Sequence, residues 1–166
     1  MWWSRRSAAL AAVAALAGCG FRPLYRGHAP AAANLAAIAV DPIPERVGQL
    51  LRNALLDRLN PRGEPRRPRY RLAVTLTRTS TALAIQPDAT TTRFNLRLDV
   101  RFTLTEAATG RTVYADHSRA IASFNQVRSD FATLAAEKDS DRRAAQAVSD
   151  EIATQLGVYF ARREGG

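Results

Sequence analysis

The side chain whose position points most clearly to chemistry is the only cysteine of the 166-residue chain, Cys19. It follows Leu16-Ala17-Gly18 and closes an apolar run that begins near Ala8, behind two arginines. A basic start, a short apolar stretch and small residues before a cleavage point are the parts of a secretory leader, and this run is too short to span a bilayer. A free cysteine is more often a small buried hydrophobe, but a core residue has no reason to stand where an apolar leader meets a polar segment. Cys19 is therefore a candidate for covalent modification after export.

The segment Leu16-Ala17-Gly18-Cys19 resembles the bacterial lipobox. The resemblance implies diacylglycerol on the Cys19 sulfur, cleavage before Cys19 and acylation of the new amino terminus by palmitate-type chains. Stable anchoring takes at least two such chains, because each buried methylene contributes only about 0.8 kcal/mol. We favour general secretion over the twin-arginine route, since Ser7-Ala8-Ala9 lacks the bulky apolar residues of that signal. The expected organisation is a signal peptide over 1–18, a lipidated tether over 19–34 and one domain over 35–163.

From Cys19 onward the chain carries 22 basic and 15 acidic residues, a net charge of +7. A basic balance favours acidic partners such as anionic lipid, phosphorylated glycolipid or nucleic acid, and export argues against nucleic acid. Acylation would use up the only thiol, so the domain must be stabilised by packing and not by a disulfide.

The residues that catalysis or metal binding would need are few. His28 and His117 are the only histidines and stand far apart in the chain, without the spacing of a zinc site. Asp116, His117 and Ser118 are adjacent in a predicted strand, where neighbouring side chains point to opposite faces and cannot form a triad. No phosphate-binding or nucleophile-elbow motif is present. We expect a protein that is not an enzyme and holds no cofactor or metal.

Cationic side chains are the remaining candidates for ligand binding. The predicted strands concentrate arginine at these positions: Arg69, Arg71, Arg78, Arg93, Arg97, Arg101 and Arg111. For any single arginine a solvated strand face is the ordinary interpretation. Arg93, Arg97 and Arg101, however, share one face of one strand and form a stripe that could bind phosphates bidentately. Lys138 is the only lysine among 24 basic residues and could mark a site that prefers a compact ammonium.

Two helices are predicted from apolar spacing. Val47, Leu51, Leu55 and Leu59 recur at helical intervals before the breaker Asn60-Pro61-Arg62-Gly63. A long C-terminal helix is expected over 130–162, with one apolar stripe made of Leu134, Ala145, Val148, Ile152, Leu156 and Tyr159. The breaker-rich segment from Cys19 to about Ala33 is read as extended chain.

Four strands are predicted. Residues 35–40 form a short buried strand stopped by prolines, and a half-buried strand starts at Tyr70. Its apolar phase changes before Leu83, which predicts a bulge between Arg78 and Ala82. The clearest alternation runs over 92–104, and a third member of the meander covers 111–124. We expect an α+β fold: two helices packed on one face of a mixed, mainly antiparallel four-stranded sheet, with a polar uncovered face.

The segment Cys19-Gly20-Phe21-Arg22-Pro23-Leu24-Tyr25, followed by this order of elements, resembles the LptE family of LPS-assembly lipoproteins, and most closely its alphaproteobacterial members. The resemblance implies a non-enzymatic outer-membrane lipoprotein, on the periplasmic side, that plugs the LptD β-barrel, helps it assemble and binds lipopolysaccharide in transit. It also implies that Lys138-Asp139 contributes to that binding. The expected hairpin tip carries Pro87-Asp88-Ala89 where enteric members have a basic residue, and Arg93 is the nearest substitute.

One alternative from another class stays open: a periplasmic accessory lipoprotein that activates a cell-wall synthase or supports a lipid-transport ATPase. It would need no barrel. The proteins that co-purify with the chain discriminate between the two. A cell-wall hydrolase would need a catalytic set that this sequence does not offer.

Overall fold

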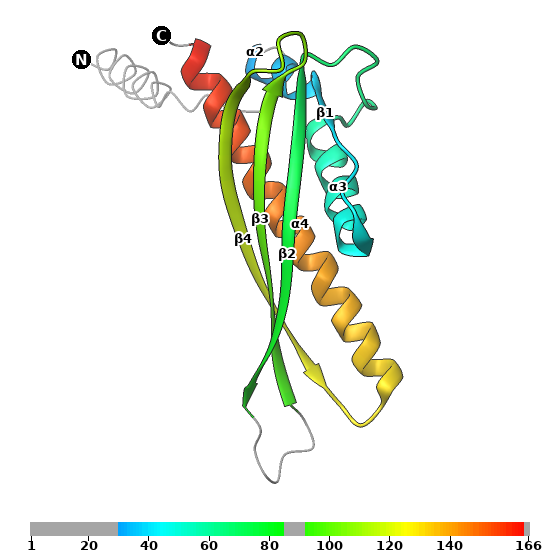
Figure 1. Cartoon of the computed structure of the whole chain (residues 1–166). Coiled ribbons are helices and arrows are strands. Elements are labelled where there is room, and N and C mark those ends of the chain that lie inside the picture. Colours follow the sequence, from blue (N-terminus) through cyan, green and yellow to red (C-terminus); the bar gives the residue numbers. More distant parts are fainter. Residues whose placement is uncertain (1–29, 85–91, 165–166) are drawn as a thin grey trace, which may run out of the picture.

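The computed structural model describes residues 30–84 and 92–164 and has the expected α+β architecture (Figure 1). The elements are α2 (Pro30–Ala36), β1 (Ile38–Val40), α3 (Glu45–Leu59), β2 (Tyr70–Ala84), β3 (Thr92–Glu106), β4 (Thr112–Gln126) and α4 (Asp130–Glu164). Four strands form one sheet in the order β1-β2-β3-β4. The first pair is parallel, because α3 carries the chain back between β1 and β2, and the other two pairs are antiparallel.

The three long strands form the predicted meander. Each has 15 residues, so the meander is roughly 50 Å long at about 3.4 Å per residue. We call the end of the molecule where β2 ends, β3 begins, β4 ends and α4 begins the distal end; it lies at the bottom of Figure 1. The other end is the proximal end.

The strict alternation predicted for β3 is confirmed. Leu96, Leu98, Val100, Phe102 and Leu104 are buried, and the arginines between them are exposed. The phase change in β2 was placed slightly wrongly. The register shift between β2 and β3 falls between Ala82 and Ala84, after the predicted interval. Leu83, on the shifted phase, is left 54% exposed.

Helix α3 covers the proximal half of the sheet through one stripe of apolar residues. Val47, Leu51, Leu55 and Leu59 are buried at the predicted spacing of four. The helix ends at Asn60, whose backbone N–H donates to the Leu56 carbonyl and whose side-chain amide donates to the Ala36 carbonyl at 3.1 Å. The C-terminus of α3 is therefore tied to the end of α2.

Gly48 allows α3 to approach the chain before it. A Cβ atom at this position would lie 2.7 Å from Ile43 Cγ2 and 3.0 Å from the Ile43 carbonyl carbon and oxygen. Gly48→Ala should lower the free energy of unfolding by about 1–3 kcal/mol, because the buried neighbours must shift. Denaturant unfolding measures the change, and Gln49→Ala, at an exposed position of the same helix, is the control. Equal stability of both variants would contradict this prediction.

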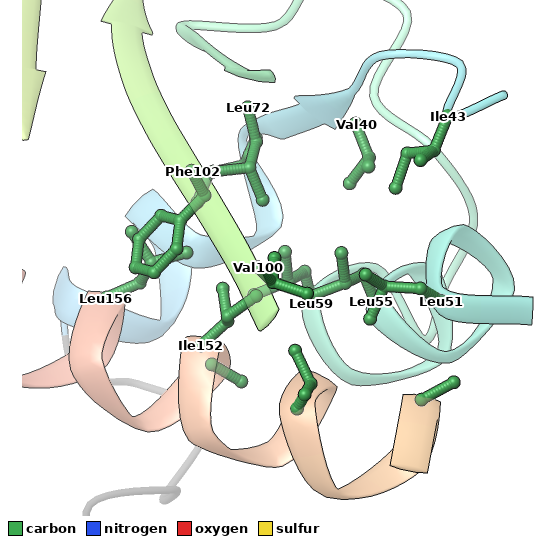
Figure 2. Packing of buried hydrophobic residues seen from close by; sticks show 14 of the residues in the cluster. Val40, Ile43, Leu51, Leu55, Leu59, Leu72, Val100, Phe102, Ile152 and Leu156 are labelled. Carbon is green, nitrogen blue, oxygen red and sulfur yellow. The ribbon is translucent and has the colours of Figure 1, made fainter. Parts of the chain in front are cut away.

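Helix α4 runs along the same face of the sheet and completes the core with α3 (Figure 1). Ala145, Val148, Ile152 and Leu156 of the predicted stripe are buried. They meet side chains of β2, β3 and α3 in one cluster, shown in part in Figure 2. Leu134 was wrongly placed in this stripe, since it is 47% exposed. The first turns of α4 lie beyond the filled part of the core.

The segment before β1 differs from its prediction. Residues 30–36 form the helix α2, where extended chain was expected, and the first strand is only three residues long. Ala-Ala-Ala-Asn-Leu-Ala is a good helix-forming sequence, and contact with α4 stabilises so short a helix. Residues 19–29 and the predicted tip Pro87-Asp88-Ala89 lie outside the described residues.

Candidate functional site

The face of the sheet opposite the helices carries the predicted arginine stripe. Arg93, Arg97 and Arg101 all belong to the exposed phase of β3. Each is four residues from the next, or roughly 13 Å along a strand. The register places Thr75 of β2 and His117 of β4 on either side of Arg101, and Thr79 and Ile121 on either side of Arg97. The structure therefore brings the three predicted arginines onto one surface.

One further arginine belongs to this surface and was missed from the sequence. Arg119 of β4 stands opposite Asp99 of β3 in the register and forms an ion pair with it. Asp99 also accepts the Arg97 guanidinium at 3.2 Å, so one carboxylate holds two arginines. The alternation of β4 is weaker than that of β3, which is why its exposed phase was harder to assign from the sequence. Arg93, Arg97, Arg101 and Arg119 together form what we call the arginine face.

The arginine face keeps a surplus of positive charge. Four arginines stand against one aspartate, a net of +3, and Arg93 and Arg101 make no ion pair with any described residue. Exposed guanidinium groups that lack an internal carboxylate are free to bind carboxylate or phosphate with two parallel hydrogen bonds. The hydroxyls of Thr75 and Thr79 in β2, which flank Arg101 and Arg97, can donate to the same oxygens.

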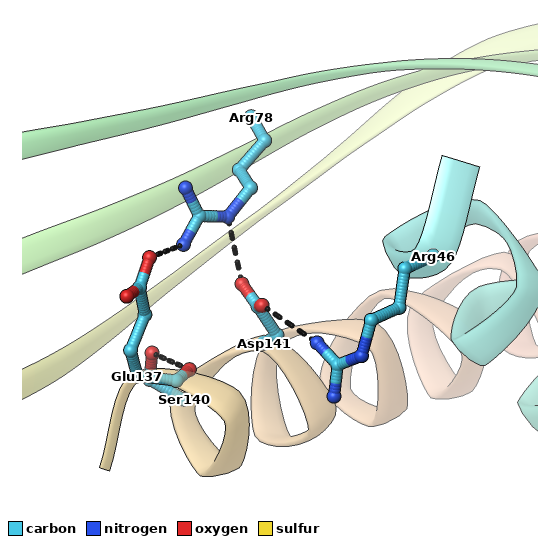
Figure 3. Close-up of polar contacts among 5 residues, drawn as sticks. All are labelled: Arg46, Arg78, Glu137, Ser140 and Asp141. Carbon is cyan, nitrogen blue, oxygen red and sulfur yellow. Dashed lines mark hydrogen bonds and ion pairs between the residues drawn. The ribbon is translucent and has the colours of Figure 1, made fainter. Parts of the chain in front are cut away.

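Arg78 lies on the other face of the sheet, although the sequence grouped it with the strand arginines. Its Nη2 atom donates to Glu137 at 2.6 Å and its Nε atom donates to Asp141 at 2.8 Å, both on α4 (Figure 3). Asp141 also accepts Arg46 of α3 at 3.3 Å. These four residues, the ionic cluster, join β2, α3 and α4 at the distal border of the apolar core. Arg78 is therefore a structural residue.

The ionic cluster is held together by charges that compensate one another. Burial alone would lower the pKa of Arg78, but hydrogen bonds and charge from Asp141 and Glu137 outweigh it and raise that pKa above its ordinary value. Arg78 is thus positively charged at any physiological pH. The Asp141 side chain is only 6% exposed, and both of its oxygens accept a guanidinium.

Lys138 does not join the arginine face. It projects from α4, which covers the buried face of the sheet, so the sheet separates it from Arg93, Arg97 and Arg101. Lys138 is exposed and makes no ion pair among the described residues. The neighbouring Asp139 is engaged elsewhere: a hydrogen bond from Arg143, together with the charge of Arg142, lowers the pKa of this carboxyl below its ordinary value of 3.8. The predicted cations therefore define two surfaces.

The remaining predicted strand arginines lie toward the proximal end. Arg71 pairs with Asp41 at 3.3 Å, and Arg69 donates to Asn34 at 3.2 Å while its guanidinium lies over the Tyr70 ring. Arg111 directly precedes β4. Two of these three arginines therefore stabilise the fold locally.

The Asp116-His117-Ser118 segment forms no triad, although His117 Nδ1 lies 3.4 Å from Asp116 Oδ1, a contact that strict alternation does not predict. Asp116 accepts a hydrogen bond from Tyr114 at 2.7 Å, which with the His117 backbone N–H lowers the pKa of its carboxyl. The His117 side chain is exposed, whereas Ser118 is buried on the opposite face. Among residues 30–84 and 92–164, no three His, Cys, Asp or Glu side chains are grouped as metal ligands.

A groove lies between α3 and α4. It is lined by Asp57, Arg58, Asp150, Ala153 and Thr154. Arg58 and Asp150 pair across it at 2.6 Å and neutralise each other. Asp57 adds a negative charge, so the groove has no positive surplus like that of the arginine face.

No helix in the described part of the chain is both long enough and apolar enough to cross a membrane. Comparison with solved structures finds the same fold in bacterial lipoproteins. A putative lipoprotein from Caulobacter crescentus CB15 superposes with a TM-score of 0.70 at 24% identity, covering 81% of this chain and 98% of the other. Rare lipoprotein B from Shewanella oneidensis gives a TM-score of 0.56 at 14% identity, with 76% and 96% covered. A minor lipoprotein from Acinetobacter baumannii gives 0.51 at 18% identity, with 73% and 90% covered.

The fold is that of the small α+β domain found in these lipoproteins, and in this chain the uncovered face of the sheet carries the arginine face. Comparison with curated proteins gave no match. Residues 35–156 match the family described as LptE, Lipopolysaccharide-assembly. The chain belongs to the LptE family, and its role is that of a lipopolysaccharide-assembly lipoprotein. The resemblance noted in the sequence is thereby confirmed.

Proposed function

We propose that this protein is a lipid-anchored plug of an LptD-type outer-membrane β-barrel, which helps the barrel assemble and binds lipopolysaccharide on its way to the cell surface. Membership of the LptE family supports the assembly role. The proposal that the ligand is lipopolysaccharide is supported by the arginine face, which has a net charge of +3 and two unpaired guanidinium groups. Lipopolysaccharide is phosphorylated, and exposed arginines bind phosphate with two parallel, charge-assisted hydrogen bonds.

The anchor in this proposal is Cys19, acylated after cleavage of residues 1–18 and held on the periplasmic side of the outer membrane. The sequence Leu16-Ala17-Gly18-Cys19 supports it. The proposed activity requires no catalytic step, cofactor or metal. Binding, positioning and release of an amphiphile are the whole of the proposed activity.

Partner identification tests the proposal directly. The full chain is tagged at its C-terminus, the membrane is solubilised gently and the co-purifying proteins are identified by mass spectrometry. We expect one large outer-membrane β-barrel in a stoichiometric amount. Recovery of a cell-wall synthase or a transport ATPase without a barrel would overturn the plug assignment in favour of an accessory lipoprotein. A mock purification from cells that carry the untagged chain is the control.

A further inference from the structure

The loop between α3 and β2 is strongly basic and lies at the proximal end of the molecule (Figure 1). It contains four arginines and one glutamate, a net charge of +3. The glutamate, Glu64, is held by Arg52 of α3 at 3.2 Å. Arg62, Arg66 and Arg67 are exposed and make no ion pair with any described residue. We call these three residues the proximal arginines; the ligand contacts discussed above do not involve them.

The loop that carries the proximal arginines is restrained by its backbone. At its end, the Arg69 N–H donates to the Ala37 carbonyl at 2.9 Å. Pro65 and Pro68 stand on either side of Arg66-Arg67. A proline restricts its own backbone and also that of the residue before it. The neighbouring guanidinium groups are therefore presented to the outside by a chain with few alternative conformations.

The loop is one part of a basic end of the molecule. The Ala107 N–H donates to the Arg69 carbonyl at 2.8 Å, which joins the loop to the turn between β3 and β4. Helix α4 ends at the same end of the molecule (Figure 1). Residues 60–69, 106–111 and 161–164 together contain seven arginines and three glutamates, a net charge of +4. The proximal end as a whole therefore attracts anions.

The proposed lipid anchor is attached at this same end. The described chain begins at Pro30 in α2, which packs against α4 at the proximal end (Figure 1). Cys19 stands eleven residues before Pro30. Because an extended residue spans at most about 3.6 Å, acyl chains on Cys19 lie within about 40 Å of α2. The anchor thus keeps the proximal end, and not the distal end, near the membrane surface.

We propose that the proximal arginines dock the domain on the anionic phospholipid headgroups of the membrane that holds Cys19. This inference rests on the anchor in the proposed function and adds an electrostatic contact to it. The tether alone does not fix an orientation, because a charge more than about 8 Å from the surface is largely screened at physiological salt. Direct contact between guanidinium groups and lipid phosphates does fix it.

This orientation leaves the arginine face free. Docking through the proximal end points β3 away from the membrane, since that strand starts at the distal end. Arg93, near its start, is thirteen residues from Glu106 at its end, so roughly 40 Å separates Arg93 from the docked end. A domain that lay along the membrane on the arginine face would instead bring both ends of the meander to the surface. The two orientations are therefore distinguishable.

The orientation of the domain on vesicles tests the proposal. Acylation of the only cysteine leaves no free thiol, so one introduced cysteine can carry a fluorescent donor. Ala108→Cys places the donor in the turn between β3 and β4, and Gln126→Cys places it at the distal end of β4; both positions are exposed. The lipidated full chain is incorporated into vesicles that carry an acceptor on their headgroups. One set contains phosphatidylethanolamine with phosphatidylglycerol, and the other contains phosphatidylcholine alone.

We expect energy transfer from position 108 to be stronger on the anionic vesicles than on the neutral ones, and transfer from position 126 to be weak on both. The loop variant, Arg62→Glu with Arg66→Glu and Arg67→Glu, should lower the ratio of docked to undocked domains about a hundredfold, the loss for three arginines at an anionic surface. Transfer from position 108 should then fall to its value on neutral vesicles.

The charge-matched control replaces Arg93, Arg97 and Arg101 with glutamate and should leave the transfer from position 108 unchanged. Equal transfer on the two kinds of vesicle, or equal losses in the two triple variants, would overturn the docking contact. Strong transfer from both 108 and 126 would overturn it as well, because the domain would then lie along the membrane.

Barrel recovery separates this contact from the proposed function. If the tagged native chain recovers the barrel but position 108 shows no difference between the vesicles, the docking contact is wrong and the plug assignment stands. If position 108 shows the expected difference but no barrel is recovered, the plug assignment is wrong and the docking contact stands.

Discussion

Asp141→Ala is expected to lower the free energy of unfolding by about 3 kcal/mol, because it removes the buried carboxylate that two arginines share. Breaking a buried ion pair on one side typically costs about 3–5 kcal/mol, most of it the penalty of leaving the other charge unpaired. Arg78 is left with Glu137, and Arg46 is 54% exposed and can be solvated, so the lower end of that range applies. Denaturant unfolding of the variant measures the loss.

A matched control is available on the same helix. Asp150 pairs with Arg58 at 2.6 Å, but its side chain is 51% exposed. An exposed ion pair contributes only about 0–1 kcal/mol, so Asp150→Ala should barely change stability. The comparison separates burial from distance, since the Asp150 pair is the shorter one. Similar losses in the two variants would show that the ionic cluster does not stabilise the fold through its buried carboxylate.

The meander and the two long helices were predictable because their sequence patterns are long and regular. The alternation over 92–104 in β3 leaves only one way to put Leu96 through Leu104 on the same side of a sheet. The stripe of α3, with prolines before and after it, is equally explicit. Long amphipathic elements determine which face each residue occupies, and from this the polar, arginine-bearing face followed correctly.

Short elements, and the sheet face on which Arg78 lies, were less predictable. The helix α2 spans seven residues and depends on tertiary contacts with α4 and Asn60, which no local pattern reveals. Arg78 continues the buried phase of Leu72, Val74 and Leu76, but a charged residue at such a position suggested the opposite face. Its partners, Glu137 and Asp141, lie about sixty residues further along the chain.

The same limit on prediction from sequence applies to the candidate site, where contacts between distant segments decide which residues share a surface. The arginine stripe lies within one strand, so its common face could be derived from spacing alone. Whether Lys138 joins that face depends on which side of the sheet α4 covers, and this is decided by packing between distant segments. The exposure of Phe131 and Leu134 depends on where the core ends along α4, which is also a tertiary property. Binding experiments must therefore treat the two cationic surfaces separately.

Replacing Arg93, Arg97 and Arg101 together with glutamate is expected to weaken lipopolysaccharide binding about a hundredfold. Each exposed charge contact contributes about 1 kcal/mol at most, and three of them amount to about two decades in affinity. Lys138→Glu, tested alone, should cost about tenfold or less, because it removes one contact on the other side of the sheet. Titration with purified lipopolysaccharide at low ionic strength gives both values, and added salt should reduce the two effects.

The control for this variant must carry the same charge change at a place where no lipopolysaccharide contact is proposed. Arg62, Arg66 and Arg67 are exposed in the loop between α3 and β2, and replacing all three with glutamate changes the net charge equally. If that variant binds as weakly as the strand variant, affinity follows overall charge and the arginine face is not a site. If only the strand variant is weakened, the contacts are local. The remaining affinity then includes what Lys138 contributes, since that residue is intact in the strand variant.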